Sequence, residues 1–285
     1  MKKIILVLWV SSISVFSQLS GGDFLSLKLK GGYGYSTIGD WNSYLVYWSN
    51  SNKAFYSTTT GENKPLHYGP SLEGELSFFI SPRLSIGLGA EYIYLERKAG
   101  TAKLSGFISG QLVFSLEHLT KISALPVKLT LTYFPVFGER FKFFIKAGVG
   151  YYSVDFKDTA KFHEGTPSFL DRTQEASATK ASEKIGYHGG LGIEIALMPH
   201  IALLFEAEGR YAKIRGFEGS GNWQRESGSG QWSGRLYYYE WKQLDWDPWI
   251  FLESPAPSGP DYRNVRDAVV DLSGVSLKAG LVFHF

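Results

Sequence analysis

Beyond the N-terminal segment, apolar and polar side chains alternate with a period of two along much of the chain. At the C-terminal end, Val275, Leu277, Leu281, Phe283 and Phe285 share one face, and small or polar residues occupy most of the other. A period of two is typical of β-strands. The same alternation predicts eight strands, at 25–35, 68–80, 84–94, 127–135, 141–153, 185–197, 201–211 and 273–285.

The two faces of these strands differ in charge. The apolar face of the eight segments carries no Asp, Glu, Lys or Arg. A soluble sandwich would turn that face inward, whereas an outer-membrane barrel turns it toward lipid and places the polar face in its lumen. The charges fall on the opposite face, at Lys28, Lys30, Glu73, Glu75, Glu91, Lys128, Lys142, Lys146, Glu194, Glu206, Glu208, Arg210 and Lys278.

Three further features favour the membrane barrel. Short connections at 81–83, 136–140 and 198–200 alternate with long ones at about 36–67, 95–126, 154–184 and 212–272. Outer-membrane barrels alternate short periplasmic turns with long outer loops in this way. Glycine is frequent on the polar face, where a narrow lumen must hold large charged side chains, and Tyr and Phe gather near the strand ends, as interfacial girdles require.

A sequence resemblance rests on three segments: the ending Leu281-Val282-Phe283-His284-Phe285, the glycine-aromatic strand at 147–152 and the turn at 136–141. On these segments the chain resembles the small eight-stranded outer-membrane β-barrels of Gram-negative bacteria, the OmpA/OmpX/OmpW-like group. The resemblance implies an all-β, transmembrane, antiparallel up-and-down β-barrel in the cell outer membrane. It also implies that Phe285 is the assembly signal read by the barrel-assembly machinery, and it transfers no other functional residue.

The N-terminus predicts a secretory signal. Lys2 and Lys3 precede an apolar run at 4–10, and small residues lead to a cut near Gln18. We therefore expect a signal peptide at 1–17 and a single barrel domain at 18–285. The alternative is a retained anchor helix, but the apolar run is shorter than the ~20 residues of a membrane-spanning helix.

Charge and cysteine content exclude several function classes. The net charge of +2 gives no general attraction for nucleic acid, and the absence of Cys excludes disulfides and thiol nucleophiles. The predicted lumen holds seven basic and six acidic residues, with opposite signs on successive pairs of strands. Because side chains can fill an eight-stranded barrel and buried charges persist when paired, we predict a salt-bridged plug. An ion path or proton relay is the alternative.

The sequence offers little sign of a catalytic site. There is neither a Gly-x-Ser-x-Gly elbow nor a His-Glu-x-x-His helix motif, so we assign no catalytic, cofactor or metal site and expect no enzyme. A lipid hydrolase at the outer rim would need a histidine beside a serine and an acid. The histidines in or near suitable positions are His67, His118, His163 and His188.

The long connections are rich in aromatic residues, and their tryptophans are candidate ligand contacts: Trp41, Trp48, Trp223, Trp232, Trp241, Trp246 and Trp249. Such rings suit a surface glycan, lipopolysaccharide or protein ligand. Alternatively, 233–243 continues the last two strands above the membrane as a hairpin. The apolar connection at 96–126 fits either strands or a short amphipathic helix.

We therefore expect a structural or surface-interaction role through the aromatic-rich extracellular loops. The chemical partners would be outer-membrane lipid and lipopolysaccharide, together with a surface ligand. Passive transport of small hydrophobic molecules, which the OmpW-like resemblance implies, is the second hypothesis. Hydrolysis of outer-leaflet lipid is the third.

Overall fold

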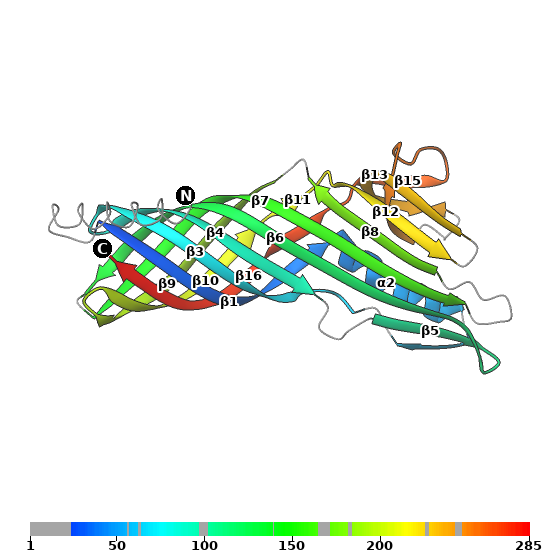
Figure 1. Ribbon diagram of the computed structural model, residues 1–285, viewed down its shortest axis with the longest axis horizontal. Helices are drawn as coiled ribbons and strands as arrows, with labels where there is room; N and C mark the ends of the chain where they lie inside the picture. The colour runs from blue at the N-terminus through cyan, green and yellow to red at the C-terminus, as the bar shows by residue number, and fades with distance from the viewer. Residues whose placement is uncertain are drawn as a thin grey trace.

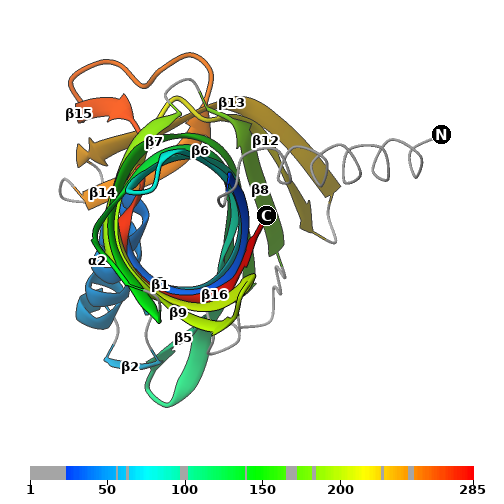
Figure 2. The ribbon, with the colours of Figure 1, turned by 90° about the vertical axis from the view of Figure 1, so that its left-hand side faces the viewer.

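The computed structural model describes residues 24–55, 57–61, 64–96, 102–138, 140–164, 172–181, 184–225, 228–242 and 247–285. Eight antiparallel strands pair in sequence order, and the last pairs with the first, so the sheet closes into the barrel that Figure 2 shows end-on. The strands of this barrel are β1 (Leu25–Gly39), β3 (Tyr68–Ser81), β4 (Leu84–Glu96), β6 (Gln111–Phe137), β7 (Phe141–Glu164), β9 (Ile185–Met198), β10 (Ile201–Tyr211) and β16 (Val270–His284).

The predicted eight-stranded antiparallel barrel is confirmed, with short turns at one end and long connections at the other. In Figure 1 the C-terminus lies at the short-turn end. β6 and β7 have 27 and 24 residues, far more than the ~10 that a strand needs to cross a bilayer, so the wall continues beyond the membrane. The expected signal peptide at 1–17 lies outside the described residues.

Strands and a helix from the long connections extend the barrel on the loop side (Figure 1). β8, β12, β13 and β14 continue the sheet outward from β7, and β5 and β2 continue it from β6. β11 pairs with β16, and β15 pairs with β13. These elements are α2 (Asp40–Phe55), β2 (Thr58–Gly61), β5 (Ala102–Ile108), β8 (Arg172–Lys180), β11 (Lys213–Ile214), β12 (Glu218–Arg225), β13 (Gly228–Trp241), β14 (Asp247–Glu253) and β15 (Tyr262–Asp267).

Three details of the long connections differ from or refine the sequence expectations. The connection at 96–126 forms the β5–β6 hairpin, so the strand alternative holds where the chain is described. The segment at 233–243 does not form a simple hairpin with the last two barrel strands, because β13 pairs with β12, β14 and β15. α2 was not expected, and within the described residues no helix is long and apolar enough to cross a bilayer.

The outward face of the lower barrel is apolar. Leu72 and Leu277 are 68% and 71% exposed, and neighbouring strands present Leu88, Leu129 and Ile145 in the same way. Tyr33 stacks on Tyr68 near the loop-side margin of this band, and other exposed aromatics at its two margins are Tyr92, Tyr133, Phe141, Tyr151, Tyr187, Tyr211 and Phe285. An apolar band bordered by aromatic rings matches the hydrocarbon core and two interfaces of a bilayer.

The inside of the barrel has three layers. At the short-turn end, Phe134 and Phe144 pack with Leu204 and Val282. Charged residues fill the middle layer. On the loop side an apolar layer, which we call the loop-side core, contains Ile38, Leu45, Leu95, Ile122, Val154, Phe156, Phe217, Leu236, Ile250 and Leu272, among others.

Candidate functional site

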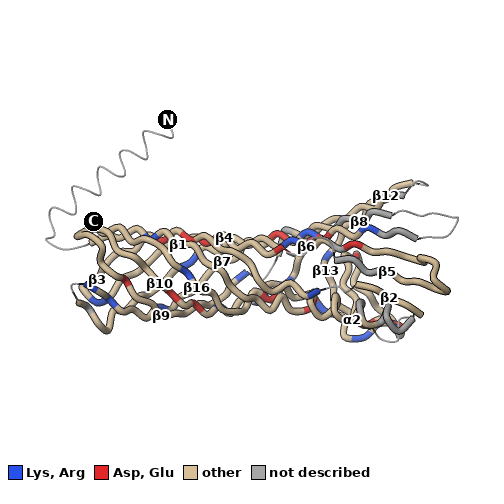
Figure 3. The backbone as a smooth tube through the Cα atoms, turned by 90° about the horizontal axis from the view of Figure 1, so that it is seen from below, with Lys and Arg blue, Asp and Glu red and all other residues tan. Residues whose placement is uncertain are grey.

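The middle layer of the lumen is a network of buried ion pairs. Its members, which we call the lumen network, are Lys28, Lys30, Lys128, Lys146, Lys278, Glu73, Glu75, Glu91, Glu194, Glu206 and Glu208. None of these side chains is more than 3% exposed. Each lysine contacts at least two glutamates. In Figure 3 basic and acidic positions are interspersed along the barrel wall.

Lys128 shows how the network is connected. Its Nζ lies 2.9 Å from carboxylate oxygens of Glu73 and Glu91 and 3.1 Å from Glu208. Lys278 contacts the same three glutamates, at 2.5 to 2.9 Å. Two ammonium groups among three carboxylates form a compact ionic centre, and such charges persist in a dry interior only when they are paired in this way.

The structure brings most of the predicted lumen charges together but leaves two at its margins. Arg210 donates from Nε to the carbonyl oxygen of Leu272 at 2.7 Å and from Nη2 to Ser36 Oγ at 3.0 Å. Lys142 is half-buried at the short-turn end, where its position on β7 lies directly opposite Glu194 on β9 in the strand register. Some pairs also reach over an intervening strand: Lys146 on β7 contacts Glu206 at 2.6 Å and Glu208 at 2.5 Å on β10, although β9 lies between the two strands.

Two lumen-facing glycines make room for these long side chains. A Cβ on Gly32 would lie 2.7 Å from Cγ of Lys278, and one on Gly87 would lie 2.9 Å from Oε1 of Glu75. Both distances are shorter than real Cβ contacts allow. Glycine at these positions lets a charged side chain lie flat against the neighbouring strand.

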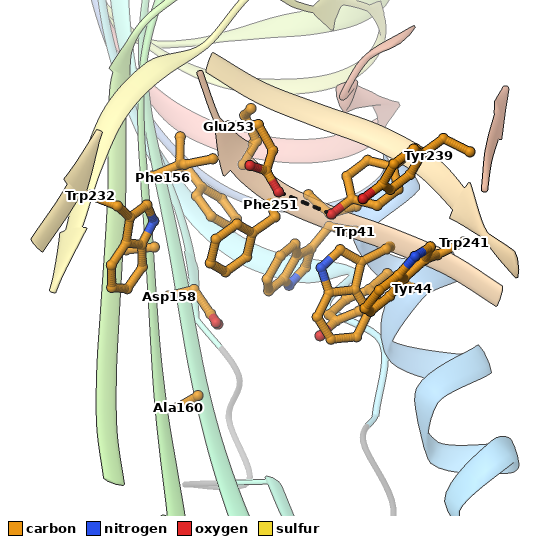
Figure 4. Close-up of a pocket in the computed structure, with 16 residues that line it drawn as sticks. Trp41, Tyr44, Phe156, Asp158, Ala160, Trp232, Tyr239, Trp241, Phe251 and Glu253 are labelled. Atoms are coloured by element: carbon orange, nitrogen blue, oxygen red, sulfur yellow. Dashed lines mark hydrogen bonds between the residues drawn. The ribbon is translucent and has the colours of Figure 1, made fainter. Parts of the chain in front are cut away.

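Above the network, on the loop side, the chain forms a partly open cavity of about 440 Å³. We call it the aromatic cavity. It lies between α2, the upper part of β7, β8 and the β13–β14 hairpin, as Figure 4 shows. Its aromatic lining residues are Trp41, Tyr44, Phe156, Trp232, Tyr239, Trp241, Trp249, Phe251 and Tyr262.

Ring contacts fix the walls of the aromatic cavity. Trp41 meets Phe156 edge-to-face with ring centroids 4.8 Å apart, and Trp232 stacks on Phe251 at 5.5 Å. Trp241 stacks on Tyr262 at 6.5 Å. Such contacts contribute to stability beyond the area that the rings bury, so they help to hold these side chains in place.

Two acidic residues, Asp158 and Glu253, also line the cavity. The hydroxyl of Thr120 donates to Asp158 at 2.7 Å and accepts from Trp41 Nε1 at 3.1 Å. The hydroxyl of Tyr239 donates to Glu253 at 3.2 Å, the contact dashed in Figure 4.

The two carboxylates influence neighbouring phenols. Burial raises the pKa of Tyr44, and the negative charge of Asp158 raises it further. Burial likewise raises the pKa of Tyr239, and the charge of Glu253 adds to that effect. Both phenols therefore stay neutral and keep their hydroxyl protons across the physiological pH range.

Four of the seven tryptophans proposed as ligand contacts line the aromatic cavity: Trp41, Trp232, Trp241 and Trp249. Trp223 lies on β12 and packs toward Gly230, away from the cavity lining. The side chain of Trp48 and the whole of Trp246 lie outside the described part of the chain.

Two of the four candidate histidines, His67 and His188, have side chains that can be placed, and neither contacts a serine hydroxyl and a carboxylate together. His67 Nδ1 lies 2.9 Å from the carbonyl oxygen of Ser36 and 3.4 Å from Nδ2 of Asn42. His188 Nε2 lies 3.0 Å from the hydroxyl of Thr130 inside the lumen. The side chains of His118 and His163 are outside the described part, so the hydrolase hypothesis gains no site from the histidines that can be placed.

Sequence reasoning missed Asp158 as a member of the site. It lies on the inward face of β7, in the run Tyr152, Val154, Phe156, Asp158, Ala160, where it is the one charged position. The expected strand ends at 153, so this run falls in an expected loop. Continuing the alternation past that point would identify a single acid on an otherwise apolar face.

A closed eight-stranded barrel with an apolar outer band, aromatic margins and a charged interior is a transmembrane β-barrel of the outer membrane. No protein-family model matches the chain, and no curated protein matches it in sequence.

Solved structures with a similar fold include three outer-membrane or surface proteins. A major outer membrane protein from Thermus thermophilus is 13% identical, with a TM-score of 0.43 over 92% of this chain and 99% of that one. Neisserial surface protein A is 10% identical, with a TM-score of 0.36 over 92% and 97% of the two chains. CarO of Acinetobacter baumannii is 11% identical, with a TM-score of 0.33 over 89% and 97%.

Proposed function

We propose that this protein is a closed outer-membrane barrel that binds a small ligand at the cell surface, in the aromatic cavity. The observation that carries the proposal is the cavity itself. About 440 Å³ lies within the range of small-molecule sites, and its lining combines many rings with a few polar groups. It lies on the side of the long connections, which face the cell exterior in barrels of this class.

The lumen supports a binding role over an open channel. The lumen network is buried, and Phe134 and Phe144 close the short-turn end below it. A solute moving along the barrel axis would have to separate several buried ion pairs, each costly to break. We therefore expect the purified protein in planar bilayers to show no steady conductance at the level of an open porin.

Ligand binding can be tested with 2-phenylethanol and 2-phenylethylamine as probes, by saturation-transfer NMR on the protein in phosphatidylcholine nanodiscs. Empty nanodiscs provide the background. We expect a saturable signal that Ala176→Trp removes, because Ala176 lines the cavity and an indole there would fill it. Ser177→Trp is the matched control. Ser177 lies on the face of β8 opposite to Ala176 and the buried Ala178, and it is not part of the cavity lining.

Three outcomes would contradict the proposal. The first is that neither probe gives a saturable signal. The second is that the signal survives Ala176→Trp, and the third is that Ser177→Trp removes the signal as fully as Ala176→Trp does. Heat-modified gel mobility of each variant confirms that the barrel is folded. Steady porin-level conductance would separately contradict the closed lumen.

A further inference from the structure

The outer face of the upper sheet carries a second hollowed surface, on the side of the wall opposite to the aromatic cavity. β7, β8, β12 and β13 lie side by side there, and their register aligns Lys157, Ser177, Ser220 and Ser233 in one row. Lys157, Ser220 and Ser233 are exposed. Ala176, which precedes Ser177, lines the aromatic cavity, so the two surfaces occupy opposite faces of one sheet.

Two shallow hollows, of about 540 and 570 Å³, lie on this outer face and share Ser177, Ser220 and Ser233. We call the two hollows together the polar groove. Its other neutral polar side chains are Asn222, Gln231, Tyr237 and Ser254. Residues 231–237 of β13 run along the groove, and an extended strand of that length covers about 20 Å. The groove is therefore long enough for a chain molecule.

The charged residues of the polar groove face one another across the strands. Glu218 lies opposite Arg235, and Arg235 lies opposite Glu253 in the register. Arg235 also forms an ion pair with Asp267. Lys157, at the β7 margin, has an interacting partner as well. A charged ligand would meet groups of both signs here, so the groove favours neither a cation nor an anion.

A neutral saccharide chain has the chemistry that this surface matches. Each sugar hydroxyl both donates and accepts hydrogen bonds, as serine hydroxyls and side-chain amides also do. A peptide would be expected at a sheet edge or over apolar pockets, and a nucleic acid on a basic surface, whereas the polar groove is a polar sheet face. Tyr237 adds a ring at one end, against which the carbon-bound hydrogens of a sugar can pack.

The position of the polar groove indicates the source of such a chain. β8, β12 and β13 continue the sheet from β7, whose lower half crosses the bilayer, so the groove lies on the outer side of the wall and on the loop side of the girdle (Figure 1). The saccharide chains of lipopolysaccharide extend from the outer leaflet along this side of the wall. We propose that the polar groove binds a neutral stretch of the saccharide chain of lipopolysaccharide in the same membrane.

The test uses the lipid-free saccharide released by mild acid from the lipopolysaccharide of the bacterium that makes the protein, separated by ion exchange into neutral and charged fragments. Dissociation constants are measured by saturation-transfer NMR on the protein in phosphatidylcholine nanodiscs, with empty nanodiscs as the background. We expect saturable binding of the neutral fragments. Ser177→Trp should weaken it about ten-fold, because Ser177 lines both hollows and an indole there would obstruct them. Ala176→Trp, whose side chain faces the aromatic cavity, is the matched control.

Amide-removing variants test the hydrogen-bonding part of the inference. Asn222 and Gln231 lie opposite each other in the register of β12 and β13. Asn222→Ala and Gln231→Ala should each weaken saccharide binding about two- to ten-fold, the effect of one lost hydrogen bond. Gln224→Ala is the matched control, because Gln224 is an exposed amide on the same face of β12 outside the polar groove. Heat-modified gel mobility confirms that each variant is folded.

The possible results separate this inference from the proposed function. Absence of binding by the neutral fragments, binding by the charged fragments alone, or binding that Ser177→Trp leaves unchanged would each overturn the saccharide inference. Equal losses in Gln224→Ala and Gln231→Ala would overturn it too, because the effect would then not belong to the groove. The inference does not depend on the aromatic cavity, and binding of 2-phenylethanol that Ala176→Trp removes and Ser177→Trp spares decides the proposed function by itself.

Discussion

The lower and upper halves of β7 contrast the two environments of this barrel. In the lower half, inward Lys146 is ion-paired, and outward Ile145 and Val149 are about half exposed to the bilayer. In the upper half, inward Phe156 belongs to the loop-side core, and outward Lys157 is exposed. The strand is continuous, so the same backbone face carries charge below and apolar groups above.

The contrast shows that the surrounding solvent decides which face is apolar. Below the girdle the outside is lipid, so apolar side chains point outward and the enclosed polar groups must satisfy one another. Above it the outside is water, so apolar side chains turn inward and form a conventional core. The height at which the faces exchange polarity therefore marks the membrane surface, close to Tyr151 on β7.

The lower half should respond most strongly to loss of a buried charge. Lys128→Met should destabilise the barrel by about 3–5 kcal/mol, because it leaves Glu73, Glu91 and Glu208 with one fewer cation in a dry lumen. Lys142→Met, at the half-buried short-turn margin, should cost much less. Urea unfolding followed by gel mobility measures both, and equal midpoints would show that the lumen is hydrated.

The outward face of β7 gives the next largest difference. Ile145→Arg, near the middle of the apolar band, should cost about 2–4 kcal/mol, because it places a charge in hydrocarbon. Thr159→Arg points outward from the same strand above the band and should be nearly neutral. Unfolding in lipid vesicles compares the two. Similar losses for both variants would place the membrane surface elsewhere.

The same contrast explains how much of the fold the sequence predicts. All eight barrel strands follow from period-two alternation with charge restricted to one face. The upper strands keep the period, but their apolar residues move to the inward face. The pattern of a lipid-facing strand therefore stops before 154–164, and the sequence analysis assigns this segment to a loop. α2 carries its own signal, with Asp40 in the first turn and Trp41, Tyr44 and Leu45 at helical spacing, but the segment is short and weakly amphipathic.

The candidate site divides in a similar way. Contacts between neighbouring strands, such as Lys30 with Glu73 at 2.7 Å, follow from adjacency and opposite charge. The contact of Lys146 with Glu206 reaches over the intervening strand β9, so it depends on barrel curvature, which alternation does not encode. Predicting the aromatic cavity would require the pairing of the loop strands as well. The pairing of β13 with three strands brings Trp232 and Trp241 toward residues of α2 and β7.

Removing the hydroxyl of Thr120 in the upper half should destabilise the protein more than removing that of Thr132 in the lower half. Thr120→Val removes the acceptor of Trp41 and a donor to Asp158, so we expect a loss of about 1–3 kcal/mol. Thr132→Val is the control, because Thr132 is buried in the lower lumen and its hydroxyl has no hydrogen-bond partner among the described residues. Urea midpoints and tryptophan emission measure both. A larger loss for Thr132→Val would contradict the comparison.

The smallest effect is expected at the water-exposed surface of the upper half. Glu240 pairs with Arg263 and accepts a hydrogen bond from Asn264 at 2.8 Å. The bond from Asn264 and the charge of Arg263 lower the pKa of Glu240 below its ordinary value. Its stabilising contribution is therefore complete above the ordinary glutamate pKa of about 4.3 and disappears as the pH falls through the lower folded value.

Glu240→Gln should accordingly cost no more than about 1 kcal/mol at neutral pH, as solvent-screened surface pairs do. The cost should shrink on acidification, because the wild-type carboxylate is then protonated and resembles the variant. Hydrogen exchange of β13 and β15 amides in both proteins, at about pH 6 and again below the lowered pKa, measures the difference. A difference that grows in acid would mean that Glu240 acts through its shape or through neighbouring backbone rather than through its charge. In that case the upper surface would depend on packed contacts, as its core does, instead of on screened ion pairs.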